Sequence, residues 1–350
     1  MSSSLVVGII IVTGFVFGKI ADRIKLPKVT GYVLAGLLLN PRLFSLMPED
    51  FVSHTDLITN ISLSFITFSI GGTLLYSRIK SLGKTILYIT VLEAEFAFIA
   101  IFLGLMIVTP FLVHIPGASL AATIIPLSIL ISALGSPTDP TATLAVTHQY
   151  GAKGEVSSTI LGVAASDDAL GLMNYSLAVV IARVFVTHAH ANFYSAALYP
   201  LFVIIGSLAL GVIFGFIFNL AYGLLKKEPG GLLIVLIFGL LSLCFGTANF
   251  LKLDELLTTM MMGAIVTNYN KDRDVIFDTL RLYAEELIFV LFFTLSGMQL
   301  NFAVLKVYYI IVIFFVVFRM AGKISGTVLG AYLSKSPAKI KRYAWGGLIP

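Results

Sequence analysis

Charged residues are scarce in this sequence, and their scarcity excludes most soluble folds. They make up 12% of the 350 residues, whereas 58% are hydrophobic and the mean hydropathy is +0.99. A soluble domain carries roughly twice that share of charge. Lipid must therefore solvate most of the surface, and we expect an all-α polytopic membrane protein without a separate soluble domain.

Cysteine and metal-ligand spacings are lacking as well. Cys244 is the sole cysteine, which excludes an intramolecular disulfide. His148, His188 and His190 lie near loops without metal-ligand spacing, and we expect them to be ordinary surface residues. No basic region precedes the first apolar run, so we interpret 5–20 as a retained span. The net charge of +5 does not indicate nucleic acid, because basic residues of membrane proteins gather in cytoplasmic loops.

Long apolar runs are what the sequence has instead. A helix needs about 20 apolar residues to cross a bilayer. We expect the two short runs, 29–39 and 256–266, to borrow flanking residues or to lie buried against neighbours. The predicted spans are 5–20, 29–39, 57–76, 85–113, 118–146, 156–186, 196–225, 232–251, 256–266, 280–300, 308–333 and a twelfth that starts near Tyr343.

Basic residues give these spans an orientation. Most of the 23 lysines and arginines fall in the loops after odd-numbered spans. The positive-inside rule places such loops in the cytoplasm and the N-terminus outside. We expect the protein to lie in the cell membrane.

An internal repeat relates the two halves of the chain. The matching positions are Ser69–Leu74 with Leu295–Leu300, Gly36 with Gly263, and Asn40 with Asn268. An odd number of spans separates the copies, so they run in opposite directions, as in secondary transporters whose sites lie near the midplane at broken helices. A complete second copy would end in a thirteenth span, and we expect the natural C-terminus to lie beyond Pro350.

Two adjacent carboxylates, Asp167 and Asp168, lie about 17 Å into the span 156–186. An ionisable residue near the midplane costs at least about 2.5 kcal/mol, so the pair needs a partner, water or a proton. Neighbouring helical residues point about 100° apart, so one acid can hold an ion pair while the other faces a cavity. A carboxyl group poised near neutral pH can exchange a proton for a metal cation.

The span 118–146 contains a predicted helix break between Pro137 and Pro140. Pro140 removes an amide donor and disfavours helical geometry at Asp139. Freed carbonyls and the Thr138 hydroxyl are hard oxygen ligands for a small cation. Asp139 before Pro140 fits the N-cap of the second half-helix, so capping is its expected main role and cation contact the alternative.

The second repeat has its own breaker, formed by Gly346, Gly347 and Pro350. Two broken helices that cross near the midplane would place opposed half-helix ends around one site. Asp139 would then neutralise one of the positive ends.

Arg319 and Lys323, four residues apart on one face of the span 308–333, are the natural countercharges. Lys323 is our first choice to pair with Asp167, because lysine can release its proton when the carboxylate changes state. Arg319 is the alternative partner. Glu93 and Glu95 face nearly opposite sides, so only one should face the interior, and a structural interaction of Glu93 with Arg319 is conceivable.

Four motifs together resemble the monovalent cation:proton antiporter superfamily, and the resemblance runs along nearly the whole chain. They are Leu26–Gly36, Thr138-Asp139-Pro140, Ser166-Asp167-Asp168 and Gly322–Gly326. The resemblance implies a homodimer with 13 helices per subunit and two crossed, broken helices. It also implies scaffold helices at 1–84 and 229–306, a moving core at 85–190 and 307–350, and a linker helix at 191–228.

By the same resemblance, Asp168 looks like the carrier of cation and proton, with Ser166 beside it, and Asp167 looks like the partner of the base. Thr-Asp-Pro is more typical of the branch that has Asn-Asp in the sixth span and Arg as its base. Asp-Asp with Lys is more typical of the electrogenic branch. The chain combines both patterns, so stoichiometry stays open.

These residues predict antiport of Na⁺ or Li⁺ against H⁺ by alternating access, with Na⁺ held at Asp168 and Thr138. A K⁺/H⁺ antiporter is the nearest alternative. An intramembrane aspartyl protease also needs two embedded carboxylates, but it draws them from separate helices with a Gly-x-Gly-Asp signature. A passive channel would show a repeated filter sequence. We therefore expect a transporter rather than an enzyme, without a cofactor.

Overall fold

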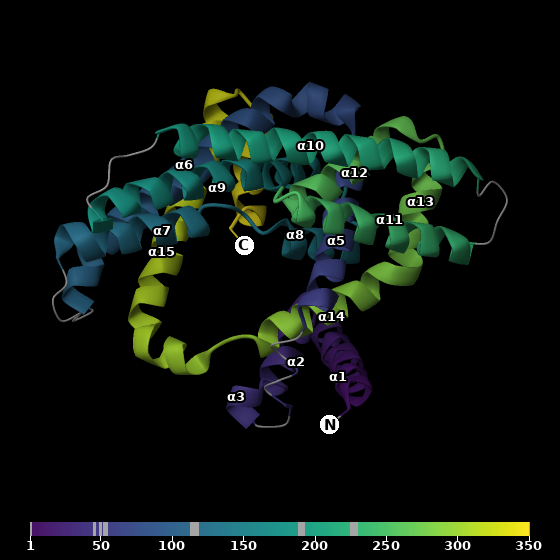
Figure 1. The fold of residues 1–350 in the computed structure, drawn as a ribbon, viewed down its shortest axis with the longest axis horizontal. Coiled ribbons are helices and arrows are strands. Elements are labelled where there is room, and N and C mark those ends of the chain that lie inside the picture. Colours follow the sequence, from purple (N-terminus) through teal and green to yellow (C-terminus); the bar gives the residue numbers. More distant parts are fainter. Residues whose placement is uncertain are drawn as a thin grey trace. The chain divides into compact units, whose positions relative to one another are not determined.

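The computed structural model describes residues 2–44, 47, 48, 51, 55–112, 119–187, 193–224 and 230–349. Within these ranges the chain forms helices and no strand, as Figure 1 shows. Seven of the described helices are long and apolar enough to cross a membrane. The all-α polytopic prediction is thereby confirmed. Pro350, His188 and His190 lie outside the described residues.

Each predicted apolar run corresponds to a helix or a group of helical segments. In chain order these are α1 (Ser3–Arg23), α2 (Lys28–Leu38), α3 (Pro41–Phe44), α5 (Asp56–Thr73), α6 (Tyr76–Leu112), η1 (Leu120–Ile124), α7 (Ile125–Gly135), α8 (Pro140–Gln149), α9 (Glu155–Thr187), α10 (Phe193–Leu224), α11 (Gly230–Phe250), α12 (Glu255–Tyr269), α13 (Arg273–Leu280), η2 (Arg281–Glu285), α14 (Glu286–Met298), α15 (Phe302–Leu333), α16 (Ala338–Tyr343) and η3 (Ala344–Gly347).

Helix ends differ most from the prediction where basic residues flank an apolar run. Helix α6 begins at Tyr76 rather than at 85, and the helix placed near Tyr343 begins at Ala338. Lysine and arginine are good helix formers, so a helix continues past the apolar run that identifies it. Helix α15 begins at Phe302 but kinks at Tyr308, where the predicted span began.

The chain divides into two compact units with interleaved segments. Three of the five boundaries fall inside α8, α10 and α15, and the other two fall between helices. Unit 1 comprises Met1–Leu75, Leu144–Ala152 and Ser207–Val304, and unit 2 comprises Tyr76–Thr143, Lys153–Gly206 and Leu305–Pro350.

Unit 1 contains reciprocal contacts between the two copies of the repeat. Asn40 Nδ2 donates to the carbonyl oxygen of Leu300 at 2.8 Å, and Asn268 Nδ2 donates to that of Leu74 at 2.9 Å. Exchanging the two copies turns the first bond into the second. The repeat read from the sequence is thus present in the packing.

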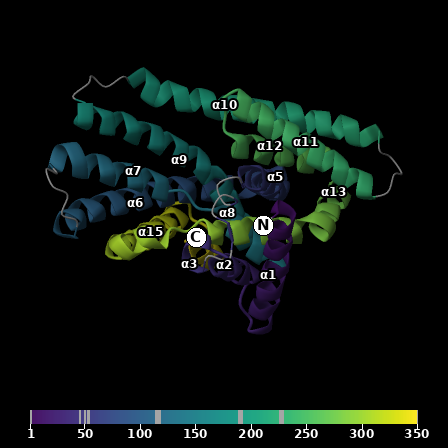
Figure 2. The ribbon, with the colours of Figure 1, turned by 60° about the horizontal axis from the view of Figure 1, so that its bottom comes forward.

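Glycines at matched positions let the same helices approach closely. A Cβ atom on Gly36 would lie 2.8 Å from the Cα of Gly297, and one on Gly263 would lie 3.2 Å from the Cα of Gly71. These contacts join α2 to α14 and α12 to α5, and Figure 2 shows α11 and α12 next to each other in the same unit. Of the two short helices, α12 is largely buried against its neighbours, whereas α2 buries one face, formed by Gly31, Tyr32, Ala35 and Gly36.

Unit 2 is built around α6, α7 and α9, which lie side by side in Figures 1 and 2. Helix α15 packs on α6 through Gly322, Gly326 and Gly330. Cβ atoms at these positions would lie 2.6, 2.7 and 2.8 Å from the Cα atoms of Ala97, Glu93 and Ile89. The four-residue spacing puts the three glycines on one face, where small residues allow two helix backbones to touch.

Candidate functional site

The predicted break in the fifth span is present in unit 2. Helix α7 ends at Gly135 and α8 begins at Pro140, with non-helical chain between them. Asp139 is exposed, and its Oδ1 accepts a hydrogen bond from the Thr141 amide at 2.8 Å. The predicted capping bond of Asp139 is therefore present. Its side-chain oxygen accepts from a backbone amide in the first turn of α8 that has no acceptor within the helix.

The second break lies at the end of the described chain. After α16 the chain tightens into the 3₁₀ turn η3, which ends at Gly347. Thr143 Oγ1, in the first turn of α8, donates to the Gly347 carbonyl at 3.1 Å. The first turn of α8 therefore contacts the turn at Gly347, where the sequence predicts the second break.

Arg319 bonds to carbonyls of both breaks. Its Nε donates to Gly135 at 2.8 Å, its Nη2 to Pro137 at 2.9 Å and its Nη1 to Ile349. Carbonyls freed from a helix at membrane depth need such partners. The planar guanidinium, which carries five donors and stays charged, suits three acceptors from separate segments.

Next to the first break lies a buried cluster formed by Glu93 of α6, Thr138 of the break, Asp167 of α9 and Lys323 of α15. The four side chains are at most 1% exposed. Lys323 Nζ donates to Glu93 Oε1 and, at 2.7 Å, to Thr138 Oγ1, and it lies 3.7 Å from Asp167 Oδ2. Asp167 Oδ2 accepts from the Thr138 amide at 2.7 Å and contacts its hydroxyl at 2.9 Å.

Each acid of the cluster retains one oxygen without a hydrogen-bond partner. Among the described residues, neither Glu93 Oε2 nor Asp167 Oδ1 has one. Buried charges repay their desolvation only when geometry and hydrogen bonds are good, and a buried acceptor left alone costs about 1–3 kcal/mol. Free carboxylate oxygens in such surroundings are suited to hold a proton or a small cation.

The structure places the two candidate bases differently. Lys323 lies within ion-pair distance of Asp167, whereas Arg319 bonds to backbone carbonyls. Glu93, for which we considered an interaction with Arg319, bonds directly to Lys323, and Arg319 interacts with it electrostatically. Glu95 points elsewhere and accepts from Asn174 Nδ2 at 3.1 Å. Sequence reasoning gave Glu93 too small a part, because nothing local shows which helix packs on α6. The available signal in the sequence was the four-residue spacing of Gly322, Gly326 and Gly330, which marks a face of α15 on which another helix can pack closely.

The remaining predicted cation ligands are more open. Asp168 is half-buried. Ser166 is exposed, and its hydroxyl donates to the Gly162 carbonyl of its own helix at 2.8 Å. Thr138 is bonded to Asp167, whereas the sequence had placed it beside Asp168. Within the described ranges no three His, Cys, Asp or Glu side chains could hold a metal ion together, so hydroxyls and carbonyls would have to complete a cation's coordination.

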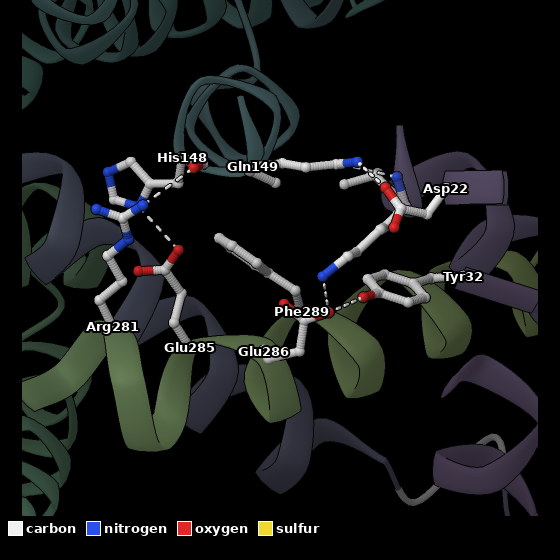
Figure 3. Close-up of a pocket in the computed structure, with 11 residues that line it drawn as sticks. Asp22, Tyr32, His148, Gln149, Arg281, Glu285, Glu286 and Phe289 are labelled. Atoms are coloured by element: carbon white, nitrogen blue, oxygen red, sulfur yellow. Dashed lines mark hydrogen bonds and ion pairs between the residues drawn. The ribbon is translucent and has the colours of Figure 1, made fainter. Parts of the chain in front are cut away.

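Unit 1 contains a separate polar pocket of about 360 Å³ around the end of α8, drawn in Figure 3. His148 Nδ1 lies 2.7 Å from Glu285 Oε1, and Gln149 Nε2 donates to Asp22 Oδ1 at 3.1 Å. Arg281 donates to the His148 carbonyl at 3.2 Å. The expectation that His148 is an ordinary surface residue is therefore wrong, because it lines this pocket and contacts Glu285. The sequence could not show this contact, because the two residues lie far apart in the chain.

Lys28 connects the other side of this pocket to α14. Its Nζ lies 2.9 Å from Glu286 Oε1, to which the Tyr32 hydroxyl also donates at 2.5 Å. The Lys28 amide donates to Gln149 Oε1 at 2.9 Å. The end of α8 is thereby attached to the start of α2 and to α14.

Comparison with known proteins gives a family and a fold. Residues 8–350 match the family described as "Sodium/hydrogen exchanger, transmembrane". The structure is similar to that of the sodium proton antiporter MjNhaP1 from Methanocaldococcus jannaschii at pH 8, with a TM-score of 0.72 and 19% identity over 98% of this chain and 82% of that one. For an electron-microscopy structure of MjNhaP1 the TM-score is 0.76 and the sequence identity is 18%, over 98% of this chain and 81% of that one. No curated protein sequence matches the chain.

Proposed function

Because the chain belongs to the sodium/hydrogen exchanger family, we propose that it exchanges Na⁺ for H⁺ by alternating access, with Asp168 as the shared binding group. Family membership makes it a membrane transporter of monovalent cations rather than an enzyme. The observation that carries the proposal is the buried cluster beside a broken helix, with a second, half-buried carboxylate next to it in the same helix.

The two adjacent aspartates are suited to different work. Two bonds from Thr138 and the nearby Lys323 ammonium fix Asp167 in place. Asp168 projects about 100° away around the helix and is more open, so a proton and a hydrated cation can reach it. One carboxylate that binds either ligand, but not both, couples the two movements.

The division into units supports a mechanism in which one part moves. Unit 2 contains Asp167, Asp168, both breaks and both bases, and we assign it the moving core. Unit 1, with its reciprocal glycine contacts, is the proposed scaffold and dimer-forming part. The proposal includes a cell-membrane location with the N-terminus outside, from the distribution of basic residues.

Transport by the purified protein in liposomes tests the proposal. An outwardly directed Na⁺ gradient should drive proton uptake, and Asp168→Asn should abolish it while the protein still folds. Li⁺ and K⁺ in place of Na⁺ identify the cation, and a response to K⁺ alone would favour the K⁺/H⁺ alternative. No Na⁺-driven proton movement, or full activity of Asp168→Asn, would contradict Na⁺/H⁺ exchange at this residue.

A further inference from the structure

Helix α8, which runs from Pro140 to Gln149, crosses the boundary between the two units. Its residues up to Thr143 belong to unit 2, and the rest of the helix belongs to unit 1. The helix contains no glycine, and its one proline stands at the first position. Helices bend sharply at an internal proline, at glycine or at a π-bulge, so α8 should move as one rigid piece. When unit 2 moves, α8 can therefore follow only one of the two units.

The start of α8 is bonded to the two helix breaks of unit 2. Asp139 Oδ1 accepts from the Thr141 amide at 2.8 Å, and the buried Thr143 hydroxyl donates to the Gly347 carbonyl at 3.1 Å. All four residues belong to unit 2. We therefore expect the whole of α8 to travel with the moving core.

The end of α8 is bonded to unit 1 through the side chains of its last two residues. The Gln149 amide uses both of its ends: Oε1 accepts from the Lys28 amide at 2.9 Å, and Nε2 donates to Asp22 Oδ1 at 3.1 Å. His148 Nδ1 lies 2.7 Å from Glu285 Oε1, as Figure 3 shows. If α8 follows unit 2, these bonds must break each time the core moves.

The surroundings of these bonds suit repeated opening. Gln149 and His148 are half-buried beside the polar pocket of about 360 Å³, and Asp22 is exposed. Water can replace such partners when the bonds break, so that opening costs little. The contact of Gly36 with Gly297 in the same unit is different, because backbone lies against backbone there and leaves no room for water.

The chain that follows α8 does not hold its end in unit 1. Unit 1 is left after Ala152, and unit 2 resumes at Lys153. Gly154 next to this point has a φ of +128°, is exposed and has no atom within 4 Å of a Cβ position. Glycine adopts positive and negative φ about equally readily, so this connection can rearrange when α8 moves.

We propose that Gln149 and His148 form a latch, which joins the end of α8 to unit 1 in the conformation of Figure 3 and opens in the opposite conformation of each exchange cycle. The inference rests on the proposed function. The strength of the latch sets how often this conformation is populated, because bonds made in one state only shift the balance between two states.

A reversible cross-link tests whether the latch must open. In the double variant Lys28→Cys/Gln149→Cys, a short bifunctional methanethiosulfonate joins the end of α8 to α2. We expect the cross-linked protein in liposomes to lose nearly all Na⁺-driven proton movement and to regain it when the link is reduced. Activity before cross-linking and after reduction shows that the variant is folded.

The matched control joins two positions of unit 1 beside the same pocket. Lys28 Nζ lies 2.9 Å from Glu286 Oε1, and both residues belong to the proposed scaffold. Cross-linking Lys28→Cys/Glu286→Cys should leave exchange intact. Loss of exchange in this control as well would overturn the latch, because it would show that unit 1 itself must deform.

Thiol labelling of the solubilised protein tests the latch without transport. Ala145 of α8 is 4% exposed and lines the pocket, so Ala145→Cys should react slowly while the latch is closed. Adding Gln149→Met, which keeps the size but removes both bonds, should speed labelling about tenfold. Glu286→Gln, which weakens the pocket without touching α8, should leave the rate unchanged. An unchanged rate with Gln149→Met would overturn the latch.

The two proposals fail in different ways. Full exchange by the cross-linked Lys28→Cys/Gln149→Cys variant would overturn the latch and leave Na⁺/H⁺ exchange standing, since α8 would then stay with unit 1. Absence of Na⁺-driven proton movement in the wild type would overturn the proposed function and, with it, the part of the latch in exchange.

Discussion

At the scale of single residues, the two bases of α15 do different work one helical turn apart. Lys323 is surrounded by side-chain oxygens and Arg319 by backbone carbonyls. The difference follows from shape, because a guanidinium presents donors in a flat fork and an ammonium is a compact point charge. The two side chains are therefore not interchangeable, although both are basic.

Arg319→Lys tests this distinction. A lysine cannot reach the carbonyls of both breaks, and each buried acceptor left without a donor costs about 1–3 kcal/mol. We expect a lower melting temperature in detergent and slower Na⁺/H⁺ exchange. Arg42→Lys, at an exposed position, is the matched control. Equal melting temperatures for the two variants would show that Arg319 does not stabilise the breaks.

At the scale of helices, close approach of α15 to α6 is what builds the buried cluster. The glycines of α15 meet backbone atoms of α6 rather than flexible side chains. The neighbours therefore cannot give way without a shift of a whole helix. Glu93 and Lys323 meet only because the two backbones touch.

Gly326→Ala should separate α15 from α6. Overpacking a tight contact costs typically about 1–3 kcal/mol, so we expect a lower melting temperature together with weaker Na⁺ binding. Gly246→Ala is the same change in α11, where no atom lies within 4 Å of the added carbon. That control should be neutral or slightly stabilising. A harmless Gly326→Ala would mean that the cluster does not depend on this contact.

At the scale of the whole molecule, the inverted repeat makes the two membrane faces of the protein alike, so another feature must set its orientation. The bonds of Asn40 and Asn268 to the opposite copy are related by exchange of the two halves. Copies that run in opposite directions through a membrane give a chain whose two faces are built alike. The asymmetric distribution of basic residues then decides which face is cytoplasmic.

Cysteine labelling in cells can check this orientation. Cys244 is fully buried, so an impermeant thiol reagent should give a low background with the wild type. Ser4→Cys should react in intact cells, and Lys335→Cys should react only after the membrane is opened. The reverse pattern would mean that the N-terminus is inside.

The sequence by itself determined the membrane class, the spans, the repeat and the helix break at Pro137 and Pro140. Each of these depends on local properties: the hydropathy of a run of residues, the missing amide of proline, or two stretches that look alike. The unlike character of Asp167 and Asp168 also followed from helix geometry alone.

Only the tertiary structure decided which distant groups meet. It brought Glu93 to Lys323, Arg319 to both breaks and His148 to Glu285. With the same spans, the same acidic and basic residues could have formed different pairs. The choice depends on which helix faces pack together, and packing of helix backbones is a property of the assembled bundle rather than of any one segment.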